Sequence, residues 1–232
     1  LNLRIIYFTF SDDSGTPKLF LADNAPQTAW SLKPFTTLPK SVDVPAGKTV
    51  RVDYSITVPA NQGAGSYYSA IMYQAGAPGG GNVSLNASGV SLAFVSVPGI
   101  VREDMTVKKF GAYATENNGN TGKFVFIAFH EPKAIAYLLK NDGNVAESPA
   151  GSIILKDMFG REVKTINATN ILSQLTLIGQ TRRYTTCIKT VQQKLKDEGG
   201  TTKNTSFTSP KLLPGRYTAS LDLFYGQNGN QT

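Results

Sequence analysis

The sequence predicts an all-β protein built as two tandem β-sandwich domains. Three observations point to this class. Apolar and polar residues alternate in several stretches, most strictly over residues 49–58, as the two faces of a half-buried strand require. Turn-forming glycine and proline, 22 and 12 residues, punctuate the chain throughout. At 232 residues the chain exceeds the roughly 100–150 residues of a typical domain, so two domains are expected.

The first domain is expected to cover residues 1–102. Leu3–Phe10 predicts a strand that is apolar on both faces and covered on both. The alternating stretch predicts a long strand with one apolar face, formed by Val50, Val52, Tyr54, Ile56 and Val58. Tyr67–Tyr73 and Val90–Val97 predict two more strands, and the glycine-rich residues 75–89 between them predict an exposed loop.

The second domain, residues 103–232, repeats this organisation. Pro98-Gly99 and the charged Arg102–Asp104 place the boundary between Val97 and Thr106. The expected strands are Thr106–Tyr113, Phe124–Phe129, Ala134–Leu139, Ser152–Lys156, Glu162–Ile166, Arg182–Ile188 and Tyr217–Tyr225.

Turns and one long insertion connect these strands. Asn141–Asn144 predicts a turn whose Asn and Asp side chains bond the backbone, and Asp157–Gly160 predicts a hairpin turn. Lys189–Lys211 is charged and rich in Thr and Ser. It predicts a mobile surface excursion with at most a helical turn over Val191–Leu195.

Two tyrosines occupy equivalent places in the two halves. Gly65-Ser-Tyr67 and Gly215-Arg-Tyr217 both follow a proline-bearing loop and open an apolar strand. A tyrosine at such a corner, with its hydroxyl bonded back to the loop, recurs in immunoglobulin-like sandwiches. We therefore expect both domains to be immunoglobulin-like.

The alternation also predicts which side chains fill the cores. They are Tyr54, Ile56, Val58, Ile71, Phe94, Ile127, Tyr137, Leu221 and Leu223. The single cysteine, Cys187, excludes an intrachain disulfide framework. It lies in a strand-like run and is expected to be a small buried apolar residue.

Residue patterns for catalysis or metal binding are weak. His130 is the only histidine, so a His-based metal cluster is excluded and a Ser-His-Asp triad would have to use it. Its place at a strand end favours a structural role. The carboxylate pairs Asp12-Asp13, Glu103-Asp104 and Asp197-Glu198 lie in expected loops and are interpreted as solubilising. We expect no enzyme activity, no bound metal and no cofactor.

The net charge is +7, which can attract nucleic acid, anionic membrane or anionic wall polymers. No dense Lys/Arg run appears, which favours a basic solvated surface. Lys108–Phe110 and Arg182–Tyr184 combine basic and aromatic residues, but each also fits a strand with outward charge and an inward ring. We expect no nucleic-acid partner.

No segment approaches the ~20 apolar residues of a membrane span, and no signal peptide appears, so we expect targeting and anchoring segments outside these residues.

A family resemblance runs along most of the chain. The N-terminal domain of the WxL-interacting proteins is similar to Val44–Val52 (VPAGKTVRV), Ile56–Pro59 (ITVP) and Gly65–Ile71 (GSYYSAI). The family's C-terminal domain is similar to Tyr137–Val145, Gly151–Asp157, Gly160–Val163 and Leu213–Tyr217. These are Gram-positive-type surface proteins with two immunoglobulin-like ectodomains. The resemblance implies a peptidoglycan-binding first domain, a host- or partner-binding second domain and a C-terminal membrane helix. That helix is not within these residues, and the Lys189–Lys211 insertion departs from the family pattern.

The leading hypothesis is a non-enzymatic, extracellular protein of the bacterial cell surface. Residues 1–102 would bind cell-wall peptidoglycan or another wall polymer, and residues 103–232 a surface or host protein. The candidate glycan-binding residues are Trp30, Tyr67, Tyr68 and Tyr73, with Gln74 as a hydrogen-bonding neighbour. For each aromatic residue, filling the sandwich core is the alternative. The runner-up is a structural spacer or a pilus-like or adhesin stalk module, and an accessory module of a secreted hydrolase is the third interpretation.

The C-terminal strand raises a separate expectation. Tyr217–Tyr225 predicts a sandwich strand, Gly226–Asn230 predicts a turn, and nothing apolar follows. An unpaired strand edge exposes backbone hydrogen-bonding groups. We expect the natural polypeptide to continue with a closing strand and a membrane anchor. The alternative is that a partner's strand fills the edge by β-augmentation.

Overall fold

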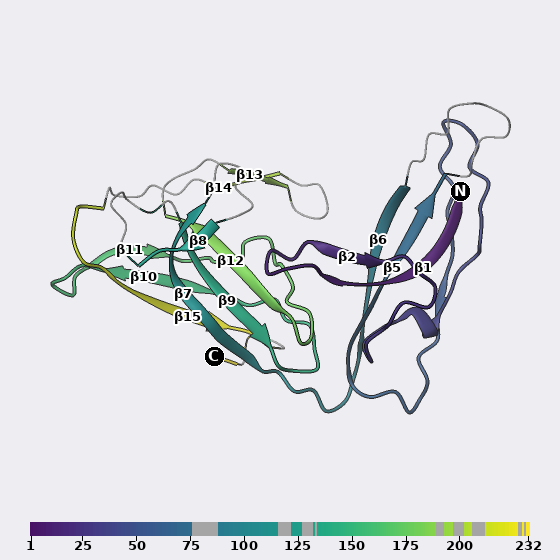
Figure 1. Cartoon of the computed structure of the whole chain (residues 1–232), viewed down its shortest axis with the longest axis horizontal. Helices are drawn as coiled ribbons and strands as arrows, with labels where there is room; N and C mark the ends of the chain where they lie inside the picture. Colours follow the sequence, from purple (N-terminus) through teal and green to yellow (C-terminus); the bar gives the residue numbers. More distant parts are fainter. Residues whose placement is uncertain are drawn as a thin grey trace. The chain divides into compact units, whose positions relative to one another are not determined.

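The computed structural model describes residues 1–75, 88–115, 122–126, 132, 134–188, 193–196, 202–205, 212–226, 229 and 231–232. Over these residues the protein is all-β, as predicted (Figure 1), and the short 3-10 turn η1 (Lys33–Phe35) lies between β2 (Pro17–Phe20) and β3 (Thr36–Thr37). None of the described elements is a helix long and apolar enough to span a membrane. The chain divides into two compact units. The first contains Leu1–Ser11 and Pro17–Val101, and the second contains Asp12–Thr16 and Arg102–Thr232.

The first unit is organised around a four-stranded antiparallel sheet in the order β2-β1-β5-β6. Its strands are β1 (Asn2–Phe10), β2 (Pro17–Phe20), β5 (Gly65–Gln74) and β6 (Ser88–Val97). β1 pairs with β5 through residues 2–6 and with β2 through residues 7–10. Ile6, Tyr7 and Phe8 are successive residues and are all buried. Because successive side chains leave opposite faces of a strand, β1 is covered on both faces, which confirms the prediction for this segment.

The predicted strand over residues 49–58 is largely wrong. Only Ser55–Ile56 (β4) forms a strand there, and it pairs with Thr36–Thr37 (β3). Tyr54, which we expected in the core, is 48% exposed. Alternation shows that a segment suits a half-buried surface, but a strand also needs a neighbour to complete its backbone hydrogen bonds. In the described part of the first unit, the rest of this segment pairs with no strand.

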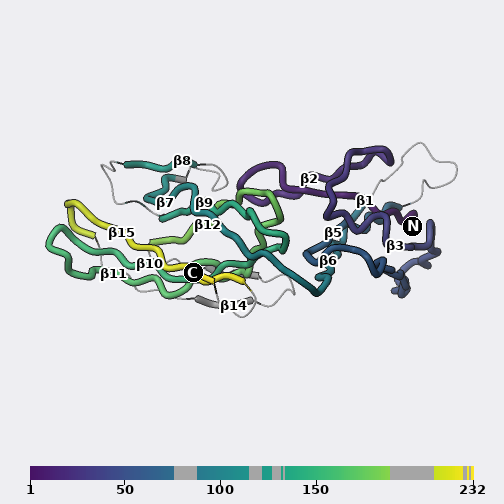
Figure 2. Tube along the Cα trace, turned by 90° about the horizontal axis from the view of Figure 1, so that it is seen from below, coloured from purple at the N-terminus to yellow at the C-terminus, as the bar shows by residue number. Residues whose placement is uncertain are grey.

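The second unit contains two larger antiparallel sheets, in the orders β12-β9-β7-β8 and β11-β10-β15. The strands of the first sheet are β7 (Met105–Thr115), β8 (Gly122–Phe124), β9 (Ala134–Asn141) and β12 (Thr181–Cys187). Those of the second sheet are β10 (Ala150–Lys156), β11 (Glu162–Ile166) and β15 (Thr218–Phe224). The two sheets form separate layers (Figure 2) and share one core, to which Ile135, Ile153, Leu155, Ile166 and Ile188 contribute. Two sheets packed face to face in this way make a β-sandwich.

Most predicted strands of the second half are present, with ends within two residues of the predicted ones. The exception is Phe124–Phe129, because β8 ends at Phe124 and residues 127–129 lie outside the described residues. The sequence allows at most a helical turn over Val191–Leu195, and the described residues of this segment, 193–195, form none. Gln193–Lys196 (β13) and Thr202–Thr205 (β14) instead form an antiparallel pair. Two short segments separated by five residues that contain glycine are typical of a hairpin, and this signal was missed.

The predicted core residues that the structure describes divide into three groups by burial. Tyr137 is fully buried, as predicted. The half-buried residues are Ile56, Val58, Ile71, Leu221 and Leu223. Tyr54 and Phe94 are exposed by 48% and 42%, contrary to the prediction, and Ile127 lies outside the described residues.

Cys187 is exposed, which corrects the expectation of a buried thiol. Its neighbours in β12 explain why. Arg182 and Tyr184 are buried, so the even-numbered side chains of this strand point inward. Because side chains alternate along a strand, Cys187 falls on the outward face.

Candidate functional site

Both corner tyrosines make the expected hydrogen bond to the loop before them. The hydroxyl of Tyr67 donates to the carbonyl of Gly63 over 2.7 Å. The hydroxyl of Tyr217 donates to the carbonyl of Leu213 over 2.5 Å. In each case the acceptor lies four residues earlier in the chain. The two halves therefore fix the loop before β5 and the loop before β15 by the same device.

Tyr67 is the more firmly held of the two tyrosines. Its side chain is only 2% exposed, and its hydroxyl also accepts a hydrogen bond from Nε2 of Gln62 over 2.7 Å. A buried hydroxyl that both donates and accepts has little freedom to move. Tyr67 is therefore a rigid support for whatever packs on its ring.

The ring of Trp30 packs against the ring of Tyr67, and backbone hydrogen bonds hold it there. The amide of Tyr68 donates to the carbonyl of Trp30 over 2.9 Å, and the amide of Leu32 donates to the carbonyl of Tyr68 over 3.1 Å. These bonds hold the segment Trp30–Leu32 along the start of β5. The side chain of Leu32 is fully buried and anchors the segment.

The resulting arrangement is the Trp30 cluster, which consists of Trp30, Phe35, Gln62 and Tyr67. The ring centroids of Trp30 and Tyr67 lie 5.6 Å apart with the planes tilted by 54°. Phe35 meets Tyr67 edge-on, with centroids 6.2 Å apart. Trp30 itself is half-buried, so the indole is supported from behind and open to solvent on its remaining surface. Such a ring suits an apolar face of a ligand, and its N–H can serve a polar group.

The structure removes Tyr68 from the candidate binding residues. Its side chain is 1% exposed and packs against the rings of Tyr7, Phe8 and Phe94. Burial, together with the hydrogen bond to Tyr7, raises the pKa of the Tyr68 phenol far above its ordinary value. Tyr68 is therefore a neutral core residue with no ring face free for stacking.

Tyr73 and Gln74 lie apart from the Trp30 cluster. Tyr73 is 42% exposed and pairs across the strands with Gly89. A Cβ atom on Gly89 would lie 2.2 Å from the Tyr73 ring, so this ring covers the glycine. Tyr73 shares a face of β5 with Tyr67 but lies six residues further on, roughly 20 Å along a strand. Gln74 is half-buried and leaves the opposite face.

Two members of the cluster, Phe35 and Gln62, were missed from the sequence. Gln62 lies in the loop that the corner tyrosine binds, so its proximity to Tyr67 could have been inferred. Phe35 ends the 3-10 turn η1, and no pattern in the sequence places this turn beside β5.

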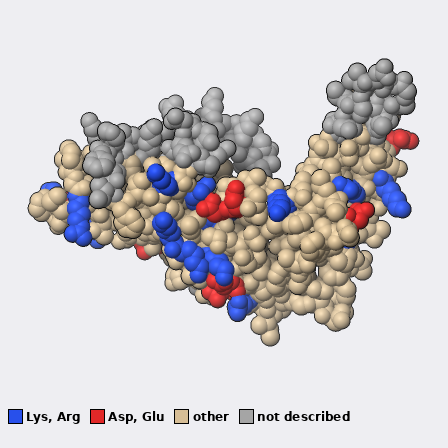
Figure 3. All heavy atoms as spheres, viewed as in Figure 1, with Lys and Arg blue, Asp and Glu red and all other residues tan. Residues whose placement is uncertain are grey.

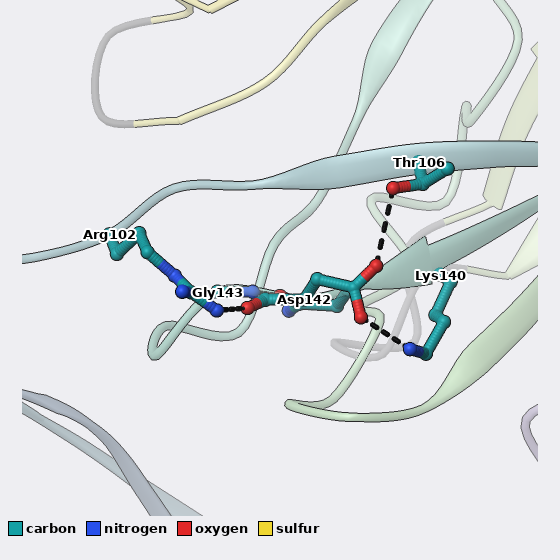
Figure 4. A network of polar contacts seen from close by, with 6 residues as sticks. Arg102, Thr106, Lys140, Asp142 and Gly143 are labelled. Atoms are coloured by element: carbon teal, nitrogen blue, oxygen red, sulfur yellow. Dashed lines mark hydrogen bonds and ion pairs between the residues drawn. The ribbon is translucent and has the colours of Figure 1, made fainter.

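The second unit carries a polar network at the Asn141–Asn144 turn (Figure 4). The Asp142 carboxylate accepts hydrogen bonds from the ammonium of Lys140 and from the hydroxyl of Thr106. The guanidinium of Arg102 donates to the backbone carbonyl of Asp142. The hydrogen bond from Lys140 is the main reason that the pKa of Asp142 is lowered. Both carboxylate oxygens of Asp142 are thus occupied by protein groups.

Asn141, at the start of this turn, is fully buried. Its Nδ2 donates to the carbonyls of Val145 and Thr176 over 2.7 and 3.0 Å. Its Oδ1 accepts from the amide of Gly143 over 2.9 Å. The prediction that side chains of this turn bond the backbone is confirmed for Asn141 and Asn144. It is wrong for Asp142, whose carboxylate accepts from the side chains of Lys140 and Thr106. The network serves the fold, and among the described residues no group of three or more His, Cys, Asp and Glu side chains is arranged to hold a metal.

No family model, curated protein or solved structure matches the chain. His130 lies outside the described residues, as does the pair Asp197-Glu198. Among the glycan-binding residues predicted from the sequence, Trp30 is the one that combines a rigid support with an exposed aromatic surface.

Proposed function

We propose that this chain is a non-enzymatic binding protein of the bacterial cell surface. In this proposal the first unit binds peptidoglycan or another wall polymer through Trp30, and the second unit binds a surface or host protein. The similarity of several segments to WxL-interacting proteins motivates the proposal. The observation that carries it is the half-buried indole of Trp30, held against the immobile ring of Tyr67 at 5.6 Å.

The strand order of the second unit supports an immunoglobulin-like topology, which is part of the same proposal. The neighbours β7-β9-β12 correspond to strands A, B and E, and β11-β10-β15 correspond to C′, C and F. Tyr217 then lies at the start of strand F, where tyrosine corners occur. In the first unit Tyr67 marks β5 in the same way, so we assign β5 and β6 to strands F and G.

The geometry favours a sugar polymer over a small molecule as the ligand of the first unit. A saccharide ring has an apolar face that stacks on an aromatic ring and a polar rim that hydrogen-bonds. The Trp30 cluster offers the stacking surface. Tyr73, on the same face of β5 but roughly 20 Å away, offers a second aromatic contact for an extended chain. Repeated weak contacts along a polymer add to a useful affinity.

Retention of the full chain on purified peptidoglycan tests the proposal. We expect Trp30→Ala to lower retention about tenfold, because a tenfold change corresponds to about 1.4 kcal/mol, within the roughly 0.5–1.5 kcal/mol of an aromatic contact. Tyr54→Ala is the matched control, because Tyr54 is an aromatic residue of the same unit that is 48% exposed and lies outside the cluster. Circular dichroism checks that both variants fold.

Two results would contradict wall binding by this site. The first is retention of the native chain no greater than that of an unrelated basic protein, which would favour the structural spacer or stalk. The second is equal retention of Trp30→Ala and the native chain, which would place any wall contact elsewhere on the surface.

A further inference from the structure

The turn between β10 and β11 exposes two large apolar side chains next to each other. Met158 is 60% exposed and Phe159 is 75% exposed. The Trp30 cluster lies in the other unit, so the proposed wall contact makes no use of them. Adjacent exposed apolar residues on a soluble domain often mark a contact surface.

This turn is rigid rather than loosely tethered. Oδ1 of Asp157 accepts hydrogen bonds from the amides of Phe159 and Arg161, each over 2.9 Å. Its Oδ2 accepts from Nε of Arg161 over 2.8 Å. The hydrogen bonds to backbone and guanidinium groups hold the pKa of Asp157 below its ordinary value, although burial opposes them. Gly160 takes the positive φ of 76° that closes the turn.

A third exposed apolar residue lies beside this turn. Leu213 is 73% exposed, and its carbonyl is fixed by the hydroxyl of Tyr217. Lys156 is paired with Thr218 across β10 and β15, so the two loops leave the same end of the sheet (Figure 1). A Cβ atom on Gly215 would lie 3.3 Å from Cε of Met158. Met158, Phe159 and Leu213 therefore lie at the same end of the sheet, on two adjacent loops, and are together called the apolar tip.

Charged side chains, most of them basic, lie next to the apolar tip. The exposed charged residues next to it are Lys156, Arg161, Glu162 and Arg216, and Asp157 is paired with Arg161. Among the residues that the structure describes, three cationic groups against two carboxylates leave this end positive, and Figure 3 shows Lys and Arg side chains there. The guanidinium of Arg161 also lies 5.2 Å from the centroid of the Phe159 ring, which keeps both groups at the tip.

We propose that the apolar tip inserts into the interface of an anionic phospholipid bilayer. Three exposed side chains on two adjacent loops cover far less than the roughly 800 Å² per partner of a stable protein interface. Shallow insertion of a few apolar groups, helped by cations attracted to anionic headgroups, is sufficient for reversible membrane binding. The preformed turn avoids an ordering cost on insertion. This inference is independent of the proposed wall binding.

Co-flotation of the full chain with vesicles tests the inference. With vesicles of phosphatidylcholine and phosphatidylglycerol, we expect Phe159→Ser to lower the partition coefficient about tenfold. We expect Arg216→Gln to lower it about fivefold on these vesicles, as loss of roughly 1 kcal/mol per cation implies. On vesicles of pure phosphatidylcholine, Arg216→Gln should leave the partition coefficient unchanged. Phe224→Ser is the matched control, because Phe224 is 48% exposed at the far end of the same strand pair, about 20 Å from the tip.

A label at the tip tests insertion directly. Cys187 is exposed, so Cys187→Ser provides a background in which Phe159→Cys or Phe224→Cys carries the fluorophore NBD. We expect anionic vesicles to shift the emission of the label at position 159 to the blue and to leave that at position 224 unchanged. Equal partition of Phe159→Ser and the native chain would overturn the inference, as would an unshifted label at position 159. Either result would favour a protein, in place of a membrane, as the partner of the apolar tip.

Discussion

At the scale of single residues, the surroundings of a side chain decide its role more than its type does. Tyr67 and Tyr68 are neighbours in β5 and both are buried, yet they leave opposite faces of the strand. Tyr67 supports the exposed indole of Trp30, whereas Tyr68 fills the core beside Phe8. The sequence motif Gly-Ser-Tyr-Tyr predicts the corner hydrogen bond but not which ring is available to a ligand.

Glu147 provides a prediction at this scale. Its carboxylate is 5% exposed and accepts a hydrogen bond from the amide of Gly226 over 2.9 Å. Burial raises the pKa of Glu147 above its ordinary value of 4.5, and the charge of Glu103 adds to this, while the bond from Gly226 opposes it. The folded state therefore binds the proton more tightly than the unfolded state. Stability from this group is greatest at low pH and falls as the pH rises from 4.5 through the raised pKa.

Replacing Glu147 by Gln removes this dependence and keeps an oxygen that accepts from Gly226. The quantity compared is the unfolding midpoint temperature of Glu147→Gln minus that of the native protein. We expect this difference to rise with pH above 4.5 and to level off at neutral pH. Thermal unfolding of both proteins from pH 4 to pH 8 measures the difference. A difference that instead falls with increasing pH would mean that the ionised carboxylate stabilises the fold.

At the scale of elements, the turn Asn141–Asn144 distinguishes two asparagines of similar appearance. Asn141 donates from its amide to two carbonyls, and it is fully buried. Asn144 uses Oδ1 to accept from the amide of Arg102 over 2.7 Å. An aspartate can accept but not donate. Asn141→Asp would therefore remove both donated hydrogen bonds and bury a charge beside the two carbonyls, although the carbonyl of Thr176 keeps the amide of Glu147 as a partner. Asn144→Asp keeps its acceptor.

We expect Asn141→Asp to lower the free energy of unfolding of the second unit by about 2–4 kcal/mol. Asn144→Asp should change it by less than about 1 kcal/mol. Urea unfolding followed by circular dichroism compares the two variants under the same conditions. Equal losses for the two would indicate that the charge matters and the donated hydrogen bonds do not.

Elements with partners close along the chain were the most predictable. The hairpin β10–β11 follows from two apolar runs around Asp157–Gly160, and β5 and β6 follow from their own runs. Residues 49–58 have the strictest alternation, but only Ser55–Ile56 pairs, and it does so with Thr36–Thr37. Alternation records which face of a segment is apolar and contains no information about whether a neighbouring strand is present.

The candidate site was predictable only in part for the same reason. Trp30 reaches Tyr67 because residues 30–32 bond the backbone of Tyr68, a contact between segments far apart in sequence. Composition singles out the lone tryptophan, and the corner motif singles out Tyr67. Their proximity is a result of the tertiary fold, as is the burial of Tyr68 that removes it from the site.

At the scale of the whole molecule, the two units differ in how they complete the strand that follows the corner tyrosine. β5 pairs with β1 on one side and with β6 on the other. β15 pairs with β10, and no other described strand pairs with it. Tyr225 and Gln231 form an antiparallel bridge, through mutual hydrogen bonds of 3.0 and 3.1 Å. The chain has therefore turned back toward the unpaired side of β15, because the backbone groups of Tyr225 that bond Gln231 face that side. The expectation of a closing strand or a partner strand at this edge stays a prediction.

The bridge also fixes the register of any strand added to this edge. Each residue added after Thr232 pairs with the residue one step further back along β15. The first, third and fifth added residues thus lie opposite Leu223, Leu221 and Ala219, on the face that packs into the core. A variant extended by six residues with valine at these three places should gain on the order of 2 kcal/mol in the stability of the second unit. The matched control moves the valines to the second, fourth and sixth places, where they face away from the core. Chemical unfolding of both variants decides the matter, because an equal gain for both would show that the added residues do not pair with β15 in this register.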